Sequence, residues 1–290
     1  MMQFLPGDTA MRIAAGRYGP DGITIEIAKN VRNEIGLDRP LFQQYYDSLI
    51  RLVNLDLGYS LVSGEKVIDE LKVQLGYSLY LAFYAFFFSI IIAIPIGIYT
   101  GSKQNGIADN LSQFVSVSIR ALPPFILGLI LIIIFSVYLN ILPTAGFEDW
   151  TYMILPALTL SLGMAAVSSR LTRDSMISVV SSSYYSYGRY KGLDNKTLIK
   201  RHGIKNAAIP IISFLGLQSI YLIEGVVVVE TVFAFPGIGH ALLHAVIARD
   251  IPMIQGSILT MGILFVLINI LADVLNAYLD PRIGEKNAKR

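Results

Sequence analysis

The chain has 290 residues, of which 54% are hydrophobic and only 15% are charged. Its mean hydropathy of +0.58 lies well above that of soluble domains and indicates a membrane protein. The lack of cysteine excludes disulfides, thiol catalysis and cysteine-bound metal, and the net charge of +2 gives no reason to expect a nucleic-acid partner.

The first part of the chain is polar, and we predict that residues 1–70 form an extracytoplasmic N-terminal segment. Five spans that end inside the cell place this segment outside, yet no apolar stretch precedes it to start its export. The opening letters "MMQFLPGD" resemble the last turn of a helix followed by a proline-glycine exit. We therefore expect that a first transmembrane helix once stood before Met1.

Five apolar stretches are long enough to cross a bilayer, whose hydrocarbon core needs about 20 helical residues. They are Leu75–Gly97, Ala121–Pro143, Trp150–Ser169, Ala207–Val229 and Ile251–Ala272. Only Ala207–Val229 contains a charge, at Glu224, and buried helices of soluble proteins rarely stay apolar on every side for so long. The expected fold is all-α: a polytopic membrane protein with five predicted transmembrane helices in a permease domain at residues 71–280.

Lysine and arginine near the ends of the spans predict the orientation of the chain. From Arg170 to Lys205, between the third and fourth spans, there are eight Lys and Arg against two acidic residues. The preceding loop, Phe147–Tyr152, has two acidic residues and no basic one. The loop at 170–206 and the basic tail at 281–290 are therefore predicted to be cytoplasmic, with the C-terminus inside.

The most basic stretch, "SYGRYKGLDNKTLIKRHGIKNAAIP", runs from Ser186 to Pro210. Asp194 is well placed as the N-cap of a short helix, Asn195–His202. On that helix Leu198 and Ile199 form an apolar spot among basic side chains. Such an amphipathic helix could lie on the membrane surface or fit a groove on a partner protein, and the pattern alone does not decide between them.

Two glycines precede this helix, and Gly188 and Gly192 would allow a tight bend between two short helices. The letters "YKGL" followed by "HGIKNAAIP" resemble the cytoplasmic EAA loop of ABC-importer permeases of the dipeptide/oligopeptide/nickel subfamily. In that comparison Gly192 matches the glycine between the two loop helices. The two alanine positions of the motif are Tyr187 and Gly188 here, a departure that bears on the details of docking.

The resemblance covers nearly the whole chain. Further segments that resemble this family, in the same order, are "LPGD", "GLDRPLFQQY", "LDLGYS", "FSVYLNILP", "ETVFAFPGIG", "RDIPMIQG" and "LDPRI". The resemblance implies a type I importer permease fold with six transmembrane helices, the first of them before "LPGD". It also implies a permease subunit that translocates dipeptides or oligopeptides across the bacterial cytoplasmic membrane, with nickel or a glutathione-like solute as the alternative.

The same resemblance implies the partners. They are a second homologous permease, two ABC ATPase subunits that use ATP and Mg, an extracytoplasmic solute-binding protein and the lipid bilayer. The loop helix is expected to dock into a cleft on an ATPase through Leu198, Ile199 and the flanking basic side chains. The residues assigned to this coupling loop are Gly188, Gly192, Leu193, Asp194, Leu198, Ile199, His202, Asn206 and Pro210.

No catalytic pattern is present in the sequence. There is no GxxxxGK[ST] loop, no HExxH zinc motif and no GxSxG elbow, so the chain is not expected to be an enzyme or to bind a cofactor, and its partners would hydrolyse ATP. The competing class is an ion-coupled secondary transporter with Glu224 as proton carrier. Inverted internal repeats would favour that class, and the sequence shows none.

Three charged residues are candidates for the solute pathway or the permease interface: Glu224, Glu230 and Arg120. An ionisable group deep in a span usually has a function, whereas Arg120 could also extend toward the inner membrane surface. His240 and His244 stand four residues apart, and imidazoles suit nickel or zinc. They are weak metal candidates, because two polar residues on an external interfacial helix explain the pair equally well, and no metal site is predicted.

Overall fold

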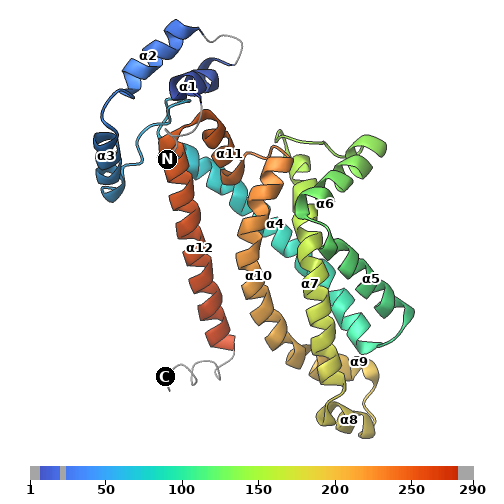
Figure 1. The fold of residues 1–290 in the computed structure, drawn as a ribbon. Helices are drawn as coiled ribbons and strands as arrows, with labels where there is room; N and C mark the ends of the chain where they lie inside the picture. The colour runs from blue at the N-terminus through green and yellow to red at the C-terminus, as the bar shows by residue number, and fades with distance from the viewer. Residues whose placement is uncertain (1–6, 20–23, 280–290) are drawn as a thin grey trace. The chain divides into compact units, whose positions relative to one another are not determined.

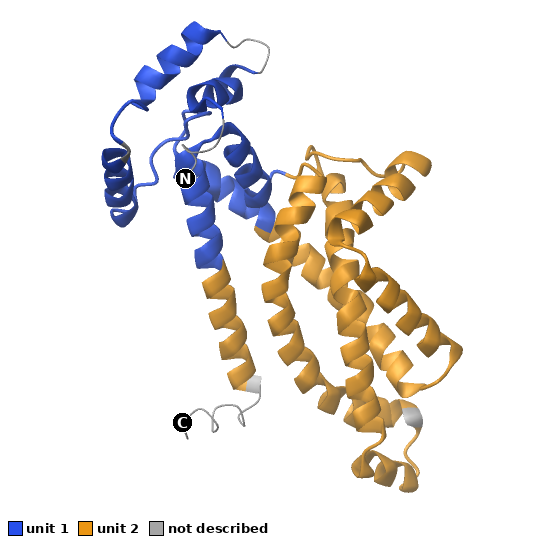
Figure 2. Cartoon of the chain, viewed as in Figure 1, with its two compact units in different colours: residues 1–78, 236–264 blue, residues 79–235, 265–290 orange. Residues whose placement is uncertain are grey.

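The computed structural model describes residues 7–19 and 24–279; the predicted tail at 281–290 and the letters before Gly7 lie outside the described residues. Within these ranges every regular element is a helix, apart from one isolated bridge between Tyr59 and Lys66 (Figure 1). The chain divides into two compact units (Figure 2): unit 1 is residues 1–78 and 236–264, and unit 2 is residues 79–235 and 265–290. The all-α fold is confirmed.

Unit 1 contains three short helices that precede the first span. Its elements are α1 (Thr9–Tyr18), α2 (Ile25–Ile35), α3 (Leu41–Val53), the start of α4 (Val67–Ser102), α11 (Ile238–Ala248) and the start of α12 (Ile251–Leu279). Asp8 caps α1, since its carboxylate accepts a hydrogen bond of 2.9 Å from the backbone N–H of Ala10. Fully buried Ile13 and nearly buried Val31 join α1 to α2 in a small apolar core.

A second core of unit 1 joins the two spans that begin there. Val67 and Leu71 of α4 pack with Ile238, Ala245 and Met253. Gly256 of α12 permits this contact, because a Cβ at that position would lie 2.7 Å from the Val67 side chain.

Unit 2 holds most of the membrane-spanning structure and the basic loop. Its elements are the rest of α4, α5 (Ile107–Ala121), α6 (Pro124–Leu131), the π-helical η3 (Ile132–Tyr138), the 3₁₀ turn η4 (Trp150–Met153), α7 (Ile154–Val180), α8 (Ser183–Tyr190), α9 (Asn195–Leu198), the π-helical η5 (Ile199–Gly203), α10 (Ile204–Val232) and the rest of α12.

Among the described residues, four helices are long and apolar enough to cross a membrane. They are Val67–Ser102, Trp150–Val180, Lys196–Val232 and Ile251–Tyr278. These four correspond to predicted spans, and a bent pair of helices is a candidate for the fifth.

The second predicted span, Ala121–Pro143, is wrong in its bounds. The apolar segment is a pair of helices, Ile107–Ala121 and Pro124–Tyr138, that meet at an angle of 108°. The break falls at Leu122, whose extended backbone (φ −87°, ψ 132°) is the conformation that a residue before proline prefers. Pro123 also lacks the N–H that a continuous helix would need there.

Helix α7 lies at the centre of unit 2 and makes polar contacts with two neighbours. Arg173 donates two hydrogen bonds to the buried carboxylate of Asp109 on α5, at 2.5 and 2.8 Å. On the other side, Gln218 of α10 accepts a hydrogen bond from Ser168 and donates one of 2.9 Å to the Met164 carbonyl. Polar side chains that bond across helices hold bundles together in lipid, where apolar association is weak.

Two glycines bring α4 close to α7. A Cβ at Gly97 would lie 2.4 Å from the Thr172 Cβ and 2.6 Å from the Ser169 carbonyl oxygen, and one at Gly101 would lie 2.6 Å from the Arg173 carbonyl oxygen. These are backbone atoms or atoms fixed to the backbone, so a larger residue could be accommodated only if a helix moved. The spacing is that of the small-xxx-small contact of membrane helices.

We predict that Gly97→Ala destabilises the permease by about 1–3 kcal/mol, because overpacking forces the helices apart. Gly163→Ala on α7 is the matched control, since a Cβ there has no atom within 4 Å. The measurement is thermal unfolding of the purified complex in detergent. Equal melting temperatures for the two variants would contradict the close α4–α7 contact.

Candidate functional site

The loop helix begins where the sequence predicts. The carboxylate of Asp194 accepts a hydrogen bond of 3.3 Å from the backbone N–H of Thr197, which is the geometry of an N-cap. The hydrogen bond from the Thr197 side chain has the largest effect on the pKa of Asp194 and lowers it, and the backbone hydrogen bond of Thr197 lowers it further. The capping carboxylate is therefore ionised at neutral pH, which suits the positive end of a helix dipole.

The predicted end of this helix at His202 is wrong. Helix α9 continues through η5 into α10, so that Lys196–Val232 is one long helical stretch. Gly203 keeps right-handed helical angles (φ −62°, ψ −69°) and packs beside the end of the Met176 side chain. The loop helix is therefore the first part of a membrane span, and a displacement of its start can pass directly along α10.

The predicted bend between the loop helices is present. Gly192 has a φ of +80°, a conformation that side chains other than glycine rarely adopt. A Cβ there would meet no atom within 4 Å, so backbone conformation alone restricts this position. Gly188 differs, because its Cβ would lie 2.5 Å from the Leu198 side chain. Gly188 allows α8 to pack against α9, and Gly192 turns the chain between them.

Leu198 anchors the loop. Its exposed fraction is 0%, and it belongs to a core with Met176 and Val179 of α7, Tyr185 of α8 and Ala207 of α10. Partly buried Leu193 and Ile199 pack against the same core. The expectation that Leu198 contacts a partner protein is therefore wrong, because the side chain is buried within this chain.

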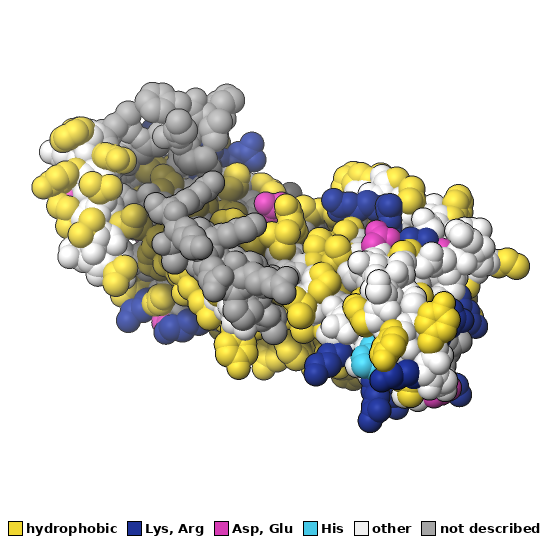
Figure 3. All heavy atoms as spheres, turned by 90° about the horizontal axis from the view of Figure 1, so that it is seen from below, with side chains coloured by type: hydrophobic (Ala, Val, Ile, Leu, Met, Phe, Trp, Pro, Cys, Tyr) yellow, Lys and Arg dark blue, Asp and Glu magenta, His cyan; other side chains and the backbone are white. Residues whose placement is uncertain are grey.

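The outer face of the loop carries tyrosines and cations. Tyr184, Tyr187 and Tyr190 are 46%, 61% and 89% exposed, and the Lys191 ammonium lies 4.7 Å from the centre of the Tyr187 ring. Other exposed basic residues on this face are Lys196, Lys200 and Arg201. Figure 3, a view from the loop end, shows Lys and Arg side chains set among hydrophobic ones over unit 2.

These tyrosines are not among the site residues predicted from the sequence. Their spacing of three residues along α8 is the signal that could have found them, since it places them near one helix face.

The remaining loop residues lie on the same continuous helix. His202 is half-buried, and Asn206 is exposed and donates a hydrogen bond of 2.7 Å to the His202 carbonyl. Pro210 is exposed inside α10. Since proline has no N–H, the Asn206 carbonyl loses its usual helical donor at this point.

Glu224 is exposed on α10, inside the span Lys196–Val232 and eight residues before its end. Leu217, Tyr221 and Val228 are exposed at helical spacing from it and share its face. A carboxylate at this depth would be costly against lipid, so the face is suited to a solute path or to another subunit.

The other two charged candidates have different settings. Arg120 is exposed in the last turn of α5, where a cation interacts favourably with the helix dipole. Glu230 is 0% exposed, contrary to the expectation that it lines a pathway or interface. It lies at the end of α10, where the chain folds back, and its backbone carbonyl accepts a hydrogen bond of 2.9 Å from Phe235.

The two histidines of α11 face one another, with ring centres 4.5 Å apart. Burial, and then the neighbouring His244, lower the pKa of His240 and favour its neutral form. In the part of the chain that the structure describes, no group of three or more His, Asp or Glu side chains is placed to hold a metal. The pair alone does not support a metal site.

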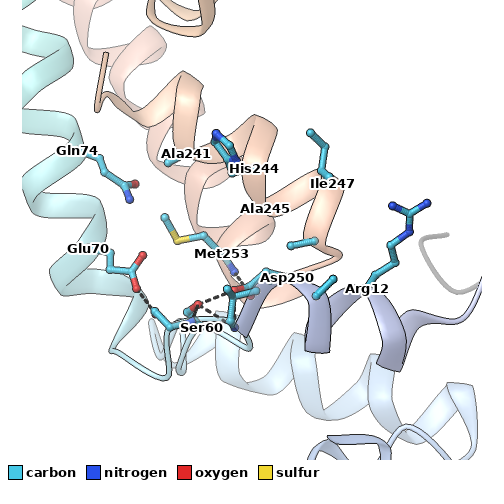
Figure 4. A pocket seen from close by; sticks show the side chains of 15 residues that line it. Arg12, Ser60, Glu70, Gln74, Ala241, His244, Ala245, Ile247, Asp250 and Met253 are labelled. Carbon is cyan, nitrogen blue, oxygen red and sulfur yellow. Dashed lines mark hydrogen bonds between the residues drawn. The ribbon is translucent and has the colours of Figure 1, made fainter. Parts of the chain in front are cut away.

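Unit 1 has a cavity of about 370 Å³ whose polar lining includes Ser60, Glu70, His244 and Asp250 (Figure 4). Asp250 is 2% exposed, accepts a hydrogen bond of 2.5 Å from Ser60, and accepts another of 3.2 Å from the N–H of Met253 at the start of α12. The carboxylate thus joins the segment before α4 to the start of α12. This contact gives a structural reason for part of the "RDIPMIQG" stretch.

The fold and the loop together define a class of protein: a helical membrane permease whose basic loop helix continues into a span. The family model described as "Binding-protein-dependent transport system inner membrane component" matches residues 93–285. The chain belongs to this family and is a permease subunit of an ABC importer, a multi-pass transport component of the inner membrane.

Similar proteins agree with this assignment. The chain is 39% identical to the glutathione transport system permease protein GsiC of Escherichia coli (strain K12), over 98% of this chain and 92% of that protein. The GsiC of Pectobacterium atrosepticum has the same identity and coverage. A solved structure of the MetNI methionine ABC transporter shares the fold, with a TM-score of 0.62 and 17% identity over 73% of this chain and 96% of that chain.

We predict that Glu224→Gln reduces ATP-driven solute uptake by roughly tenfold while the transporter still assembles, because an ionisable side chain kept in a span usually serves a function there. The measurement is uptake into vesicles, with co-purification of the subunits as the test of assembly. Glu26→Gln, at an exposed carboxylate of α2 outside the spans, is the matched control. Normal uptake by Glu224→Gln would show that the carboxylate has no part in transport.

Proposed function

We propose that this chain is one permease half of an importer for short peptides, tripeptides of the glutathione kind included. The curated relatives described above are glutathione transport permeases by name, which supports this solute class over others. Nickel import by the same machinery has no comparable support, because His240 and His244 have no third metal ligand beside them among the described side chains. The family description names a transport system that depends on a binding protein, which also argues against an ion-coupled secondary transporter.

The observation that carries the coupling mechanism is the burial of Leu198. The loop is attached to α7 and α10 through one apolar core, and its helix is continuous with α10. A protein that bound the tyrosines and cations of the outer face would therefore move the spans along with the loop. This is the connection that an ATPase subunit needs in order to convert its closure into an opening of the pathway.

We further propose the full assembly: this permease, a second homologous permease, two ATPase subunits that bind ATP and Mg, and an extracytoplasmic binding protein. The chain has no catalytic role in this scheme, and ATP hydrolysis belongs to the ATPases. The face of α10 that carries Glu224 lines the pathway or contacts the second permease. The loop and the C-terminus lie in the cytoplasm, in keeping with the eight Lys and Arg between Arg170 and Lys205.

We predict that Gly192→Val uncouples ATP hydrolysis from transport or releases the ATPases. Valine at a φ of +80° strains the backbone by about 1–3 kcal/mol, and relief of this strain would shift α9. Gly192→Asn is the control, because asparagine tolerates positive φ better than a β-branched residue does. The measurements are co-purification of the ATPases and solute-stimulated hydrolysis in vesicles. Normal values for Gly192→Val would mean that the loop only sets topology.

The solute class is tested with the complete transporter in vesicles supplied with ATP and the binding protein. Labelled glutathione or a labelled dipeptide should accumulate, and nickel ion should not. The same vesicles with an ATPase variant unable to hydrolyse ATP are the control and should take up neither peptide. Accumulation of nickel without either peptide would overturn the proposal.

A further inference from the structure

A second cavity lies beside the loop, within unit 2, and has a volume of about 520 Å³. It is bordered by the last turns of α4, the end of α7, helix α8 and η5. It is separate from the Glu224 face of α10, and the import of peptides does not explain its presence. Its lining combines apolar side chains with two cations.

The walls are apolar. Ile94 and Ile98 of α4, Val180 of α7 and Ile199 of η5 line the cavity, and each is only partly buried against the core that holds Leu198. Aliphatic side chains that remain partly uncovered give water no hydrogen-bond partner. The surface they form suits a hydrocarbon chain.

The cavity lining also carries two cations, Lys103 and Arg189. The Lys103 ammonium lies 3.4 Å from the Tyr99 hydroxyl, and no ion pair is found for Lys103 or Arg189 anywhere in residues 7–19 and 24–279. The carboxylates of Asp109 and Asp174 are both bonded to Arg173 instead. Within the described residues no carboxylate is paired with either cation, so their charge is open to another anion.

The walls and the cations are set at different depths along a membrane span. Ile94 precedes Lys103 by nine residues, which is about 13 Å along a helix axis. Lys103 directly follows α4, one of the spans, so the cation lies toward the membrane surface and Ile94 toward the hydrocarbon. Basic pockets between spans near this surface are suited to anionic lipid head groups.

We propose that this cavity binds one anionic glycerophospholipid, with an acyl chain against Ile94 and Ile98 and the phosphate between Lys103 and Arg189. A free phosphate would satisfy the cations but would leave the apolar walls uncovered. A neutral lipid would cover the apolar walls but would bring no net charge to the two cations. Because Arg189 and Ile199 belong to the loop region, the bound lipid holds the loop against the end of α4.

The test measures lipid binding to the purified transporter by native mass spectrometry, together with its melting temperature. The probes are phosphatidylglycerol, phosphatidylcholine with the same acyl chains, and inorganic phosphate. We expect phosphatidylglycerol alone to be retained and to raise the melting temperature. Equal retention of phosphatidylcholine, or the same thermal shift with inorganic phosphate, would overturn the proposal.

Variants locate the site. The double variant Lys103→Gln, Arg189→Gln should lower the affinity for phosphatidylglycerol by roughly thirtyfold. The control Arg170→Gln, Lys205→Gln removes the same charge from exposed positions of the same loop region but does not touch the cavity lining, and it should bind normally. Ile98→Trp fills the apolar part without changing charge and should also abolish retention. Equal binding by the double variant and its control would show that the lipid lies elsewhere.

Discussion

The burial of one leucine decides how the rest of the permease can work. Leu198 has no exposed surface, and it joins α9 to α7, α8 and α10 in a single core. Packed cores of this kind do not deform gradually, so the loop moves together with the ends of these helices or does not move. An exposed Leu198 would have given a partner more apolar surface to bind but no connection to the spans.

Glycines, which have no side chain beyond a hydrogen atom, make this packing possible. Gly188 leaves room for Leu198, and Gly97 and Gly101 let α4 approach the backbone of α7. In lipid the helices gain little from the hydrophobic effect, so close contact between backbones and interhelical hydrogen bonds hold them. The ion pair of Arg173 with buried Asp109 adds α5 to the same assembly. The loop core is therefore continuous with a network that reaches α4, α5, α7 and α10.

Local features could be predicted from the sequence, and features set by distant packing could not. The cap at Asp194 and the bend at Gly192 depend on neighbouring residues and were both found. The break at Pro123 had a local signal in two adjacent prolines, but an apolar window averages across it. An apolar spot at Leu198 indicates a contact without naming the partner, and the burial of Glu230 depends on tertiary structure.

The basic character of the loop has more than one physical cause. The positive-inside rule, which predicts the orientation of a membrane protein, counts all of its Lys and Arg residues alike. In the structure these residues make different contacts. Arg173 is bonded to two carboxylates and stabilises the bundle, and Lys191 lies over a tyrosine ring on the outer face. Arg189 lines a cavity instead, together with Lys103, which directly follows α4. Since only some of these charges point outward, the number of basic residues in such a loop overestimates the charge available to a docking partner.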